Sequence, residues 1–156
     1  MLEEFQDPLA NYDPKDYSDP VDRALAEEPV TAIHHTPFCA VPPDMPIEEA
    51  INLMASKGIS CLLVEEDDKL IGVFSERDAL MKVALDLDAL ADRPISEFMT
   101  PNPIYVDETS ASASALCVMA VSGYRHVPII DLAEKIKGIV SPQRVTEFLT
   151  HQLEST

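Results

Sequence analysis

The spacing of apolar residues changes several times along the chain, and it predicts strands and helices in alternation. Short apolar runs rich in β-branched residues predict strands at CLLVEE and LIGVF in the first half and at HVPII and IKGIV in the second. Ahead of each pair of runs, apolar residues recur every three or four positions, as on one face of a helix. These helical positions are Ile47, Ala50, Ile51 and Met54 in the first half and Leu116, Met119 and Ala120 in the second.

The ends of these helices carry signals of their own. Asp44 and Thr109 are candidate N-caps, because their side chains can accept hydrogen bonds from the first free amides of a helix. Gly58 and Gly123 are expected to end the same helices, since glycine adopts the left-handed conformation at little cost. In each half a further helix is expected to begin near a serine, Ser75 or Ser141.

The chain matches itself at an offset of 65 residues, which aligns Pro29 with Pro94 and Gly58 with Gly123. After one inserted residue the match continues at an offset of 66. Self-similarity held over about 55 residues indicates two copies of one supersecondary unit. The predicted boundaries are residues 29–93 for the first copy with its linker and residues 94–156 for the second.

Each copy has the order strand, helix, strand, strand, helix. We therefore expect an α/β fold of two βαββα repeats. Neither copy is large enough to cover both faces of its sheet, so the repeats should pack together about a pseudo-twofold axis.

Residues 1–28 belong to neither copy and are acidic, with Asp-Pro occurring three times. This composition leaves two alternatives open: a disordered arm, or an arm that docks on the body of the protein or on a neighbouring subunit. A short helix is possible from Asp19 through Glu28, because Pro20 suits a first helical turn. Val21 and Leu25 would then be docking points, together with Leu9 or Phe5 upstream.

The net charge of −17 limits the partners of this 156-residue protein. Such a field repels phosphate backbones and anionic lipid, so neither nucleic acid nor a membrane surface is expected as a partner. No apolar run approaches the roughly 18 residues that span a bilayer, and the acidic N-terminus does not resemble a signal peptide. Cys39, Cys61 and Cys117 have the spacing of neither a disulfide framework nor a metal site. We expect a cytoplasmic protein with buried, reduced thiols.

Chemistry-bearing motifs are scarce. His34 and His35 are adjacent in an extended segment, so their side chains point to opposite sides, and no other ligand lies at a suitable spacing. No metal site and no required cofactor is therefore expected. The sequence also contains none of the common hydrolase, zinc-protease or phosphate-loop motifs, and we do not expect an enzyme.

Three longer runs, PISEFMTPNPIYV, GYRHVPIID and IGVFSERDAL, resemble the tandem cystathionine-β-synthase (CBS) domain pair, or Bateman module. The resemblance covers about residues 29–150. It implies a module that binds adenosine-containing ligands in the clefts between its repeats, pairs into a flat dimer, and senses rather than catalyses.

The resemblance also implies roles for single residues. Ser75 and Asp78 match the Ser/Thr-x-x-Asp signature whose aspartate accepts hydrogen bonds from a ribose diol. In the second copy Ser141 matches, but Arg144 replaces the aspartate, and a guanidinium has no acceptor for a ribose hydroxyl. We therefore expect one working ligand site per chain.

The partner surface for Asp78 is expected from the second repeat. Arg125 and His126 would reach ribose and phosphate, whereas the equivalent positions of the first repeat (Ile59, Ser60, Cys61 and Leu63) carry no cation and would face Arg144. The expected adenine wall is Met99, Ile104, Tyr124 and Pro128, and Arg77 completes the set of candidate ligand residues.

The same residues could instead have structural roles. Asp78 could complement the helix dipole or pair with Arg77, Arg125 and His126 could pair with nearby carboxylates, and Tyr124 could be plain core. Arg144 could instead reach a phosphate in the intact site.

These residues predict a stand-alone regulatory module that binds AMP, ADP or ATP in one inter-repeat cleft and acts as a ligand-sensing homodimer. S-adenosylmethionine ranks lower, because without a phosphate it makes less use of Arg125 and His126. The alternative is a structural or interaction module with vestigial sites that mediates oligomerisation or docking on an unidentified protein target.

Overall fold

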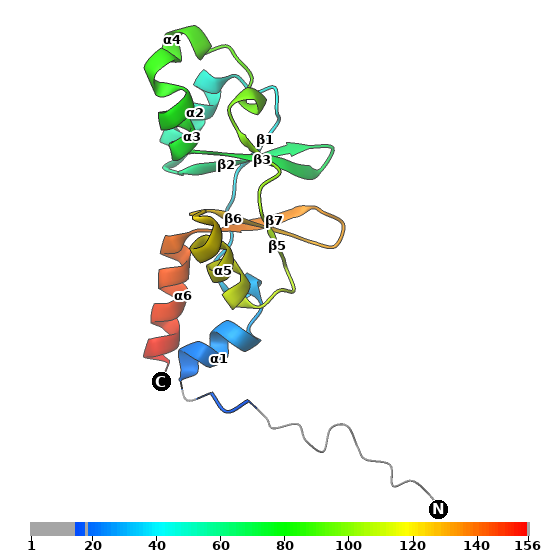
Figure 1. The fold of residues 1–156 in the computed structure, drawn as a ribbon, viewed down its shortest axis with the longest axis vertical. Helices are drawn as coiled ribbons and strands as arrows, with labels where there is room; N and C mark the ends of the chain where they lie inside the picture. The colour runs from blue at the N-terminus through cyan, green and yellow to red at the C-terminus, as the bar shows by residue number, and fades with distance from the viewer. Residues whose placement is uncertain (1–14, 18, 156) are drawn as a thin grey trace, which may run out of the picture.

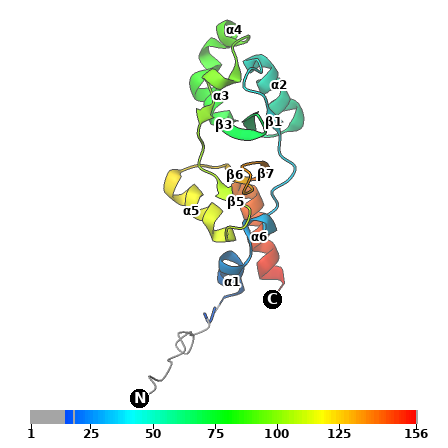
Figure 2. The same ribbon diagram turned by 90° about the vertical axis from the view of Figure 1, so that its right-hand side faces the viewer.

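The computed structural model describes residues 15–17 and 19–155. The chain forms two α/β halves stacked end to end, each with its sheet toward the other half and its helices outside (Figure 1). The side view shows the same stacking, with two chain crossings between the halves (Figure 2). The predicted fold class, two βαββα repeats packed on each other, is confirmed.

The first half contains one four-stranded sheet in the order β1-β2-β3-β4. Strand β1 runs parallel to β2, and the remaining neighbours are antiparallel. Its elements are β1 (Ala40–Val41), α2 (Ile47–Lys57), β2 (Cys61–Glu66), β3 (Lys69–Ser75), α3 (Glu76–Lys82), η2 (Ala84–Asp86), α4 (Leu87–Leu90), η3 (Ile95–Glu97) and β4 (Thr100–Pro101).

The second half repeats this plan with a three-stranded sheet in the order β5-β6-β7. Here too the first pair is parallel and the second antiparallel. Its elements are β5 (Val106–Asp107), α5 (Ser112–Ser122), β6 (Val127–Ile130), β7 (Ile136–Val140) and α6 (Pro142–Glu154), and α1 (Pro20–Glu27) and η1 (Val30–Ala32) pack beside them.

The described part of the N-terminal arm docks on the second half. Asp19 caps α1 by accepting a hydrogen bond from the amide of Val21 at 2.8 Å, and Pro20 lies in the first turn. Ala24 is buried and Leu25 packs beside it against the core that α5 and α6 share. The suggested docking points Phe5 and Leu9 lie outside the described residues.

The segment that leads into each repeat packs with the other half. The carbonyl of His35 accepts a hydrogen bond from the amide of Ile139 in β7 at 2.9 Å. Reciprocally, β4 pairs with β3, so that Thr100 lies opposite Val73. The repeats of the sequence are therefore not separate units in space, because the first residues of each repeat pair with a strand of the other repeat.

The expected side-chain caps of α2 and α5 were wrong. Pro46 and Ala111 occupy the N-cap positions, and neither makes a side-chain cap. The first amides instead donate to distant backbone carbonyls, Ile47 to Arg93 at 2.9 Å and Ser112 to Glu28 at 2.8 Å. The glycine stops are confirmed, since Gly58 and Gly123 end the helices with φ of 62° and 68°.

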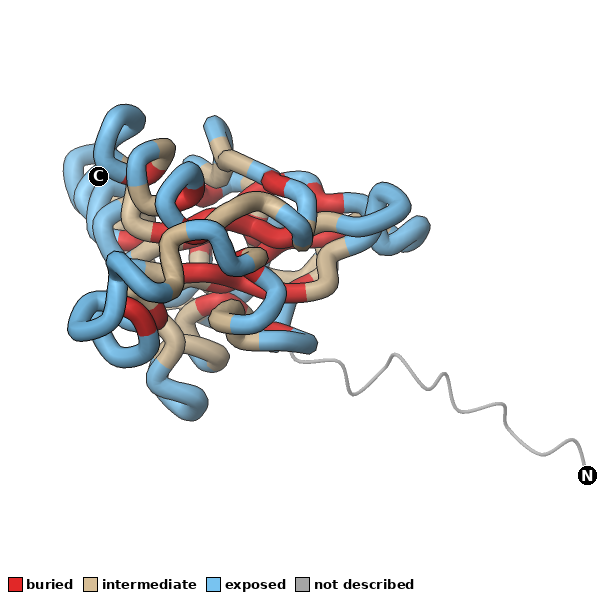
Figure 3. The backbone as a smooth tube through the Cα atoms, turned by 90° about the horizontal axis from the view of Figure 1, so that it is seen from above, coloured by how far each residue is buried: buried red, intermediate tan, exposed pale blue. Residues whose placement is uncertain are grey.

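Three apolar clusters form the interior. One lies within each half, and the third joins the facing sheets through Cys61, Leu63 and Val73 of the first half and Ile136 and Ile139 of the second. Seen from above, buried segments concentrate along the central strands and exposed segments lie around them (Figure 3). The third cluster sets the separation of the two sheets, because its members are apolar and exclude water.

The cysteines differ from one another. Burial raises the pKa of the Cys61 thiol to about 12, with the nearby charge of Asp78 adding to the effect, so this thiol is neutral and part of the core. Cys39 is half-buried. Cys117 is exposed on α5, and the expectation that every thiol is buried was wrong there.

The strand glycines Gly72 and Gly138 permit the two chain crossings, and alanine at these sites should affect the free energy of unfolding unequally. A Cβ on Gly138 would lie 2.6 Å from the carbonyl oxygen of His35, which the β7 hydrogen bond holds in place. The three atoms nearest to a Cβ on Gly72 all belong to the flexible side chain of Met99. We expect Gly138→Ala to lower stability by about 1–3 kcal/mol and Gly72→Ala by less, as urea unfolding would measure. Equal losses would contradict this reading of the crossings.

Candidate functional site

A cleft of about 650 Å³ lies between the two halves. From the first half it is lined by the start of β2, the end of β3, α3 and Thr100 of β4. From the second half it is lined by residues 123–126, ahead of β6, and by the first residues of α6. Both repeats therefore contribute the same kinds of element, as expected near a pseudo-twofold axis.

Six of the nine candidate ligand residues line this cleft. Four of them bear charge or can do so, and they come from both halves. The six are Ser75, Arg77 and Asp78 from the first half and Tyr124, Arg125 and His126 from the second.

The other three candidates, all proposed for the adenine wall, are not among the lining residues. Met99 packs against Gly72 and the first-half core, Ile104 is 45% exposed, and Pro128 is buried in β6 opposite Ile139. Their role in an adenine wall stays a prediction.

Sequence reasoning missed other apolar residues of the lining. Val73 and Met81 line the cleft beside Tyr124. A signal existed for Val73, because it lies two residues before Ser75 in a strand and therefore on the same face.

The carboxylate of Asp78 is buried and receives four hydrogen-bond donors. Its Oδ2 accepts from the backbone amide and from the hydroxyl of Ser75, each at 2.9 Å. Its Oδ1 accepts from the Thr100 hydroxyl at 3.1 Å and pairs with the Lys82 ammonium at 2.7 Å. Together with the Ser75 hydroxyl, which accepts from the Asp78 amide, this forms a capping box at the start of α3.

These contacts set the protonation of Asp78. Burial alone would raise the pKa of the carboxyl, but hydrogen bonds from Lys82 and Ser75 outweigh it and hold the pKa below its ordinary value. Asp78 is therefore a fixed, ionised acceptor at neutral pH. Among the ion pairs of the described residues, the partner of Asp78 is Lys82 and not Arg77.

His126 joins the two halves across the cleft. Its Nε2 lies 2.9 Å from the hydroxyl of Ser60, the residue just before β2. Burial lowers the pKa of His126, the positive charge of Arg125 lowers it further, and Glu76 opposes the shift. The imidazole is thus mainly neutral near pH 7 and offers a hydrogen bond rather than a full charge.

Arg144, which replaces the second aspartate, binds backbone instead of lining the cleft. Its guanidinium donates to the carbonyls of Ile139 at 2.8 Å and of Pro37 at 2.7 Å. These bonds hold the first chain crossing against β7. The second candidate position is thereby used for structure, and Ser60 and Cys61, expected to face Arg144, line the cleft of Asp78.

The charge of the cleft differs from that of the whole chain. Three basic side chains line it, Arg77, Lys82 and Arg125, against the two carboxylates of Glu76 and Asp78. In a protein of net charge −17, this is a local surface where an anionic ligand can bind.

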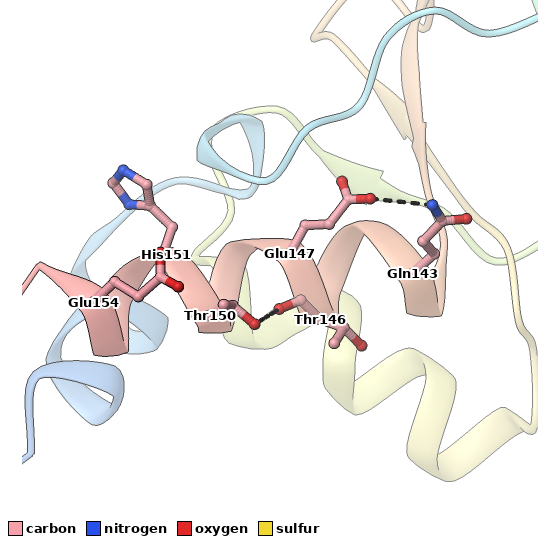
Figure 4. Close-up of a pocket in the computed structure, with 6 residues that line it drawn as sticks. All are labelled: Gln143, Thr146, Glu147, Thr150, His151 and Glu154. Carbon is pink, nitrogen blue, oxygen red and sulfur yellow. Dashed lines mark hydrogen bonds between the residues drawn. The ribbon is translucent and has the colours of Figure 1, made fainter.

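A second hollow follows the outer surface of α6. Six polar side chains of this one helix line it, and the Gln143 amide donates to Glu147 at 3.1 Å (Figure 4). Since no other element supplies a wall, convergent binding groups are missing from this part of the described structure, and we assign it no ligand.

The described residues form neither a metal-binding cluster nor a membrane-spanning helix. No group of three or more His, Cys, Asp and Glu side chains there is arranged to hold a metal ion. None of the helices in that part of the chain is long and apolar enough to cross a bilayer.

The fold and the shared cleft define a protein built from two α/β repeats related by a pseudo-twofold axis. The family model of the CBS domain matches residues 30–85 and 95–151. The chain belongs to the CBS domain family and contains a tandem pair, which confirms the resemblance noted in the sequence.

Two relatives in sequence illustrate the range of the family. A 17.7 kDa protein of Acidianus ambivalens is 34% identical over 113 residues, which cover 72% of this chain and 67% of the relative. The CBS domain-containing protein CBSCBSPB5 of Arabidopsis thaliana is 31% identical over 97 residues, or 62% of this chain. The match spans only 18% of that longer plant protein.

Solved structures show the same arrangement. A CBS-domain protein of Agrobacterium tumefaciens is 28% identical, with a TM-score of 0.64 over 71% of this chain and 88% of that one. The CBS-pair protein CBSX2 of Arabidopsis thaliana, solved in complex with AMP, is 25% identical, with a TM-score of 0.69 over 81% and 98% of the two chains.

Asp78→Asn should lower stability in a pH-dependent way. The amide cannot accept from both the Ser75 amide and the Lys82 ammonium, so we expect a loss of about 1–2 kcal/mol near pH 7. Because the folded pKa of Asp78 is lowered, its contribution is complete above the ordinary aspartate pKa and disappears as the pH falls through the folded value. The difference from wild type should therefore shrink below about pH 4.

Urea unfolding at several pH values measures this difference. The control is Asp92→Asn, which neutralises an exposed carboxylate and should change stability by less than about 0.5 kcal/mol. A loss that is the same at pH 3 and pH 7 would contradict the assignment.

Proposed function

We propose that this protein is a regulatory module that binds one adenine nucleotide per chain in the inter-repeat cleft, without catalysing a reaction. One observation carries the proposal: an ionised, rigidly held carboxylate lines the same cleft as a guanidinium and an imidazole from the other half. Asp78 comes from α3 of the first half, and Arg125 and His126 come from the second. CBSX2, whose structure contains AMP, has the same fold and supports the class of ligand.

The chemistry of the cleft matches the parts of a nucleotide. Asp78 is a hydrogen-bond acceptor for a ribose hydroxyl, and Arg77 and Arg125 are donors for phosphate. The apolar surface of Val73, Met81 and Tyr124 suits a purine ring. Arg144 offers no ribose acceptor at the second position, so the stoichiometry is one ligand per chain.

Binding would act through the contact between the halves. A nucleotide that touches α3 and residues 123–126 together favours the arrangement in which the halves hold it best. Such a ligand shifts a conformational equilibrium only as far as its affinity differs between the two arrangements. The third apolar cluster, which joins the sheets, is the packing that would respond.

One observation favours the rival function, a structural or interaction module with vestigial sites. The capping box gives Ser75 and Asp78 a full structural purpose without any ligand. In that case the cleft would bind no adenine nucleotide, and loss of Asp78 would change stability alone.

Removal of one ribose hydroxyl tests the nucleotide assignment without altering the protein. Isothermal titration of AMP and 2′-deoxy-AMP into wild type should show about tenfold or more weaker binding of the deoxy compound, the value of one charge-assisted hydrogen bond. In Asp78→Asn both ligands should bind weakly and almost equally. Asp92→Asn, which removes the same charge elsewhere, should behave as wild type.

Equal affinities of the two ligands for wild type would remove Asp78 from the ribose site. Absence of saturable binding by AMP, ADP and ATP would establish the rival function.

The proposal includes a homodimer, in line with the family resemblance. Two large apolar side chains on neighbouring elements of the first half are exposed, Leu80 at 69% on α3 and Leu85 at 96% on η2. Contact with a second copy would remove this apolar surface from water.

Light scattering after gel filtration should give twice the chain mass of 17.2 kDa for wild type. Joint replacement of Leu80 and Leu85 by Gln should shift the mass toward the monomer, since it removes about 2 kcal/mol or more of apolar burial per subunit. Leu132→Gln, at an equally exposed site in the β6–β7 turn, should leave the mass unchanged. A monomeric wild type would contradict the dimer.

A further inference from the structure

The Asp78 carboxylate has no free acceptor position for a ribose. A carboxylate offers about four lone-pair sites, two on each oxygen. Ser75 fills Oδ2 with its amide and its hydroxyl, and Thr100 and Lys82 fill Oδ1. If the proposed nucleotide binds here, on which this inference rests, at least one of the four donors must leave.

Lys82 is the donor best able to leave. The Ser75 amide is fixed in the backbone ahead of α3, and the two hydroxyls are carried by short, half-buried side chains. Lys82 reaches Asp78 from the next turn of α3 through four methylene groups, and its side chain is 41% exposed. It can move into the cleft without a change of backbone.

The cleft offers the released ammonium a new partner only if the ligand carries a phosphate. Lys82 lines the same cleft as Arg125. An ammonium that leaves a carboxylate exchanges one anion for another when a phosphate is present, and an ammonium donor suits phosphate oxygens. A nucleoside without phosphate would displace Lys82 and give nothing in return.

We infer that Lys82 is a specificity-determining residue, which occupies the ribose face of Asp78 in the free protein and moves to the phosphate of a bound nucleotide. The residue thereby selects phosphorylated ligands and rejects free nucleosides.

The same movement affects the second chain crossing. Lys82 also donates to the carbonyl of Phe98 at 2.8 Å and lies 3.4 Å from that of Met99. Both precede β4, the strand that pairs with β3 and leads into the second repeat. Departure of Lys82 would release these carbonyls, so occupancy of the cleft reaches the segment that connects the halves.

Titration of AMP and adenosine into wild type and Lys82→Met tests the inference. Methionine keeps an unbranched side chain that is shorter by one heavy atom, and it removes the charge. We expect wild type to prefer AMP strongly. In Lys82→Met, adenosine should bind about tenfold tighter and AMP no tighter, so that the AMP-to-adenosine preference falls by about tenfold or more.

The matched control is Lys57→Met, which removes the same charge from the end of α2, outside the cleft lining. It should keep the wild-type preference. Thermal unfolding by circular dichroism verifies that each variant folds, and Lys82→Gln replaces Lys82→Met if the methionine variant does not.

Two failures are distinguishable. If AMP binds wild type but the AMP-to-adenosine preference is the same in Lys82→Met, the role of Lys82 is overturned and the proposed function stands. If ADP or ATP binds wild type and AMP does not, the same comparison is made between that nucleotide and adenosine. If AMP, ADP and ATP all fail to bind wild type, the proposed function fails and the inference fails with it.

Discussion

The reciprocal exchange of chain between the two halves is the constraint on which the remaining structure depends. The His35 carbonyl completes the edge of β7, and β4 completes the edge of β3. The first amides of α2 and α5 likewise find their acceptors on residues that immediately precede a repeat. Neither sequence repeat can therefore satisfy its backbone polar groups alone, and leaving such groups buried and unpaired is costly. The sheets must face each other, and the apolar cluster between them follows.

Because the two repeats face each other, equivalent residues of the repeats come into contact across the cleft. Some of these equivalent residues differ in type. Ser60 and His126 occupy equivalent positions at the offset of 66, and they hydrogen-bond to each other across the cleft. The basic residue Arg125 has no charged counterpart at Ile59. Ser60, Arg125 and His126 all line one cleft, whereas Ile59 packs against the first-half core. The cation of the second repeat therefore has no counterpart at the equivalent position of the first, and one working site per chain stays a prediction.

Features that depend on residues close together in the sequence were predicted correctly. Features that depend on contacts between distant residues were not predicted. The repeat order, the glycine stops and the helix starts at Ser75 and Ser141 each depend on residues close together in the chain. The caps of α2 and α5 could not be predicted, since their acceptors are backbone carbonyls of distant residues that any amino acid provides. The exposure of Cys117 was hidden because α5 is apolar on nearly every side. The Lys82 contact with Asp78 follows helical spacing, but its bonds to Phe98 and Met99 depend on the packing of β4.

Asp78 can both cap α3 and bind a ligand, and the differences between the two repeats show how. A buried carboxylate needs a cation and several donors to stay ionised, and Ser75 at the end of β3, Thr100 of β4 and Lys82 of α3 supply them. In the second repeat the aspartate is Arg144, and the position equivalent to Lys82 is Phe148, a buried residue of the second-half core. The first repeat thus has both the lysine and the carboxylate. The second repeat has neither, and a core phenylalanine takes the position of the lysine. In the free protein, Lys82 stabilises the buried carboxylate of Asp78. Because the Lys82 side chain is exposed and flexible, it can leave Asp78 when a ligand brings a phosphate.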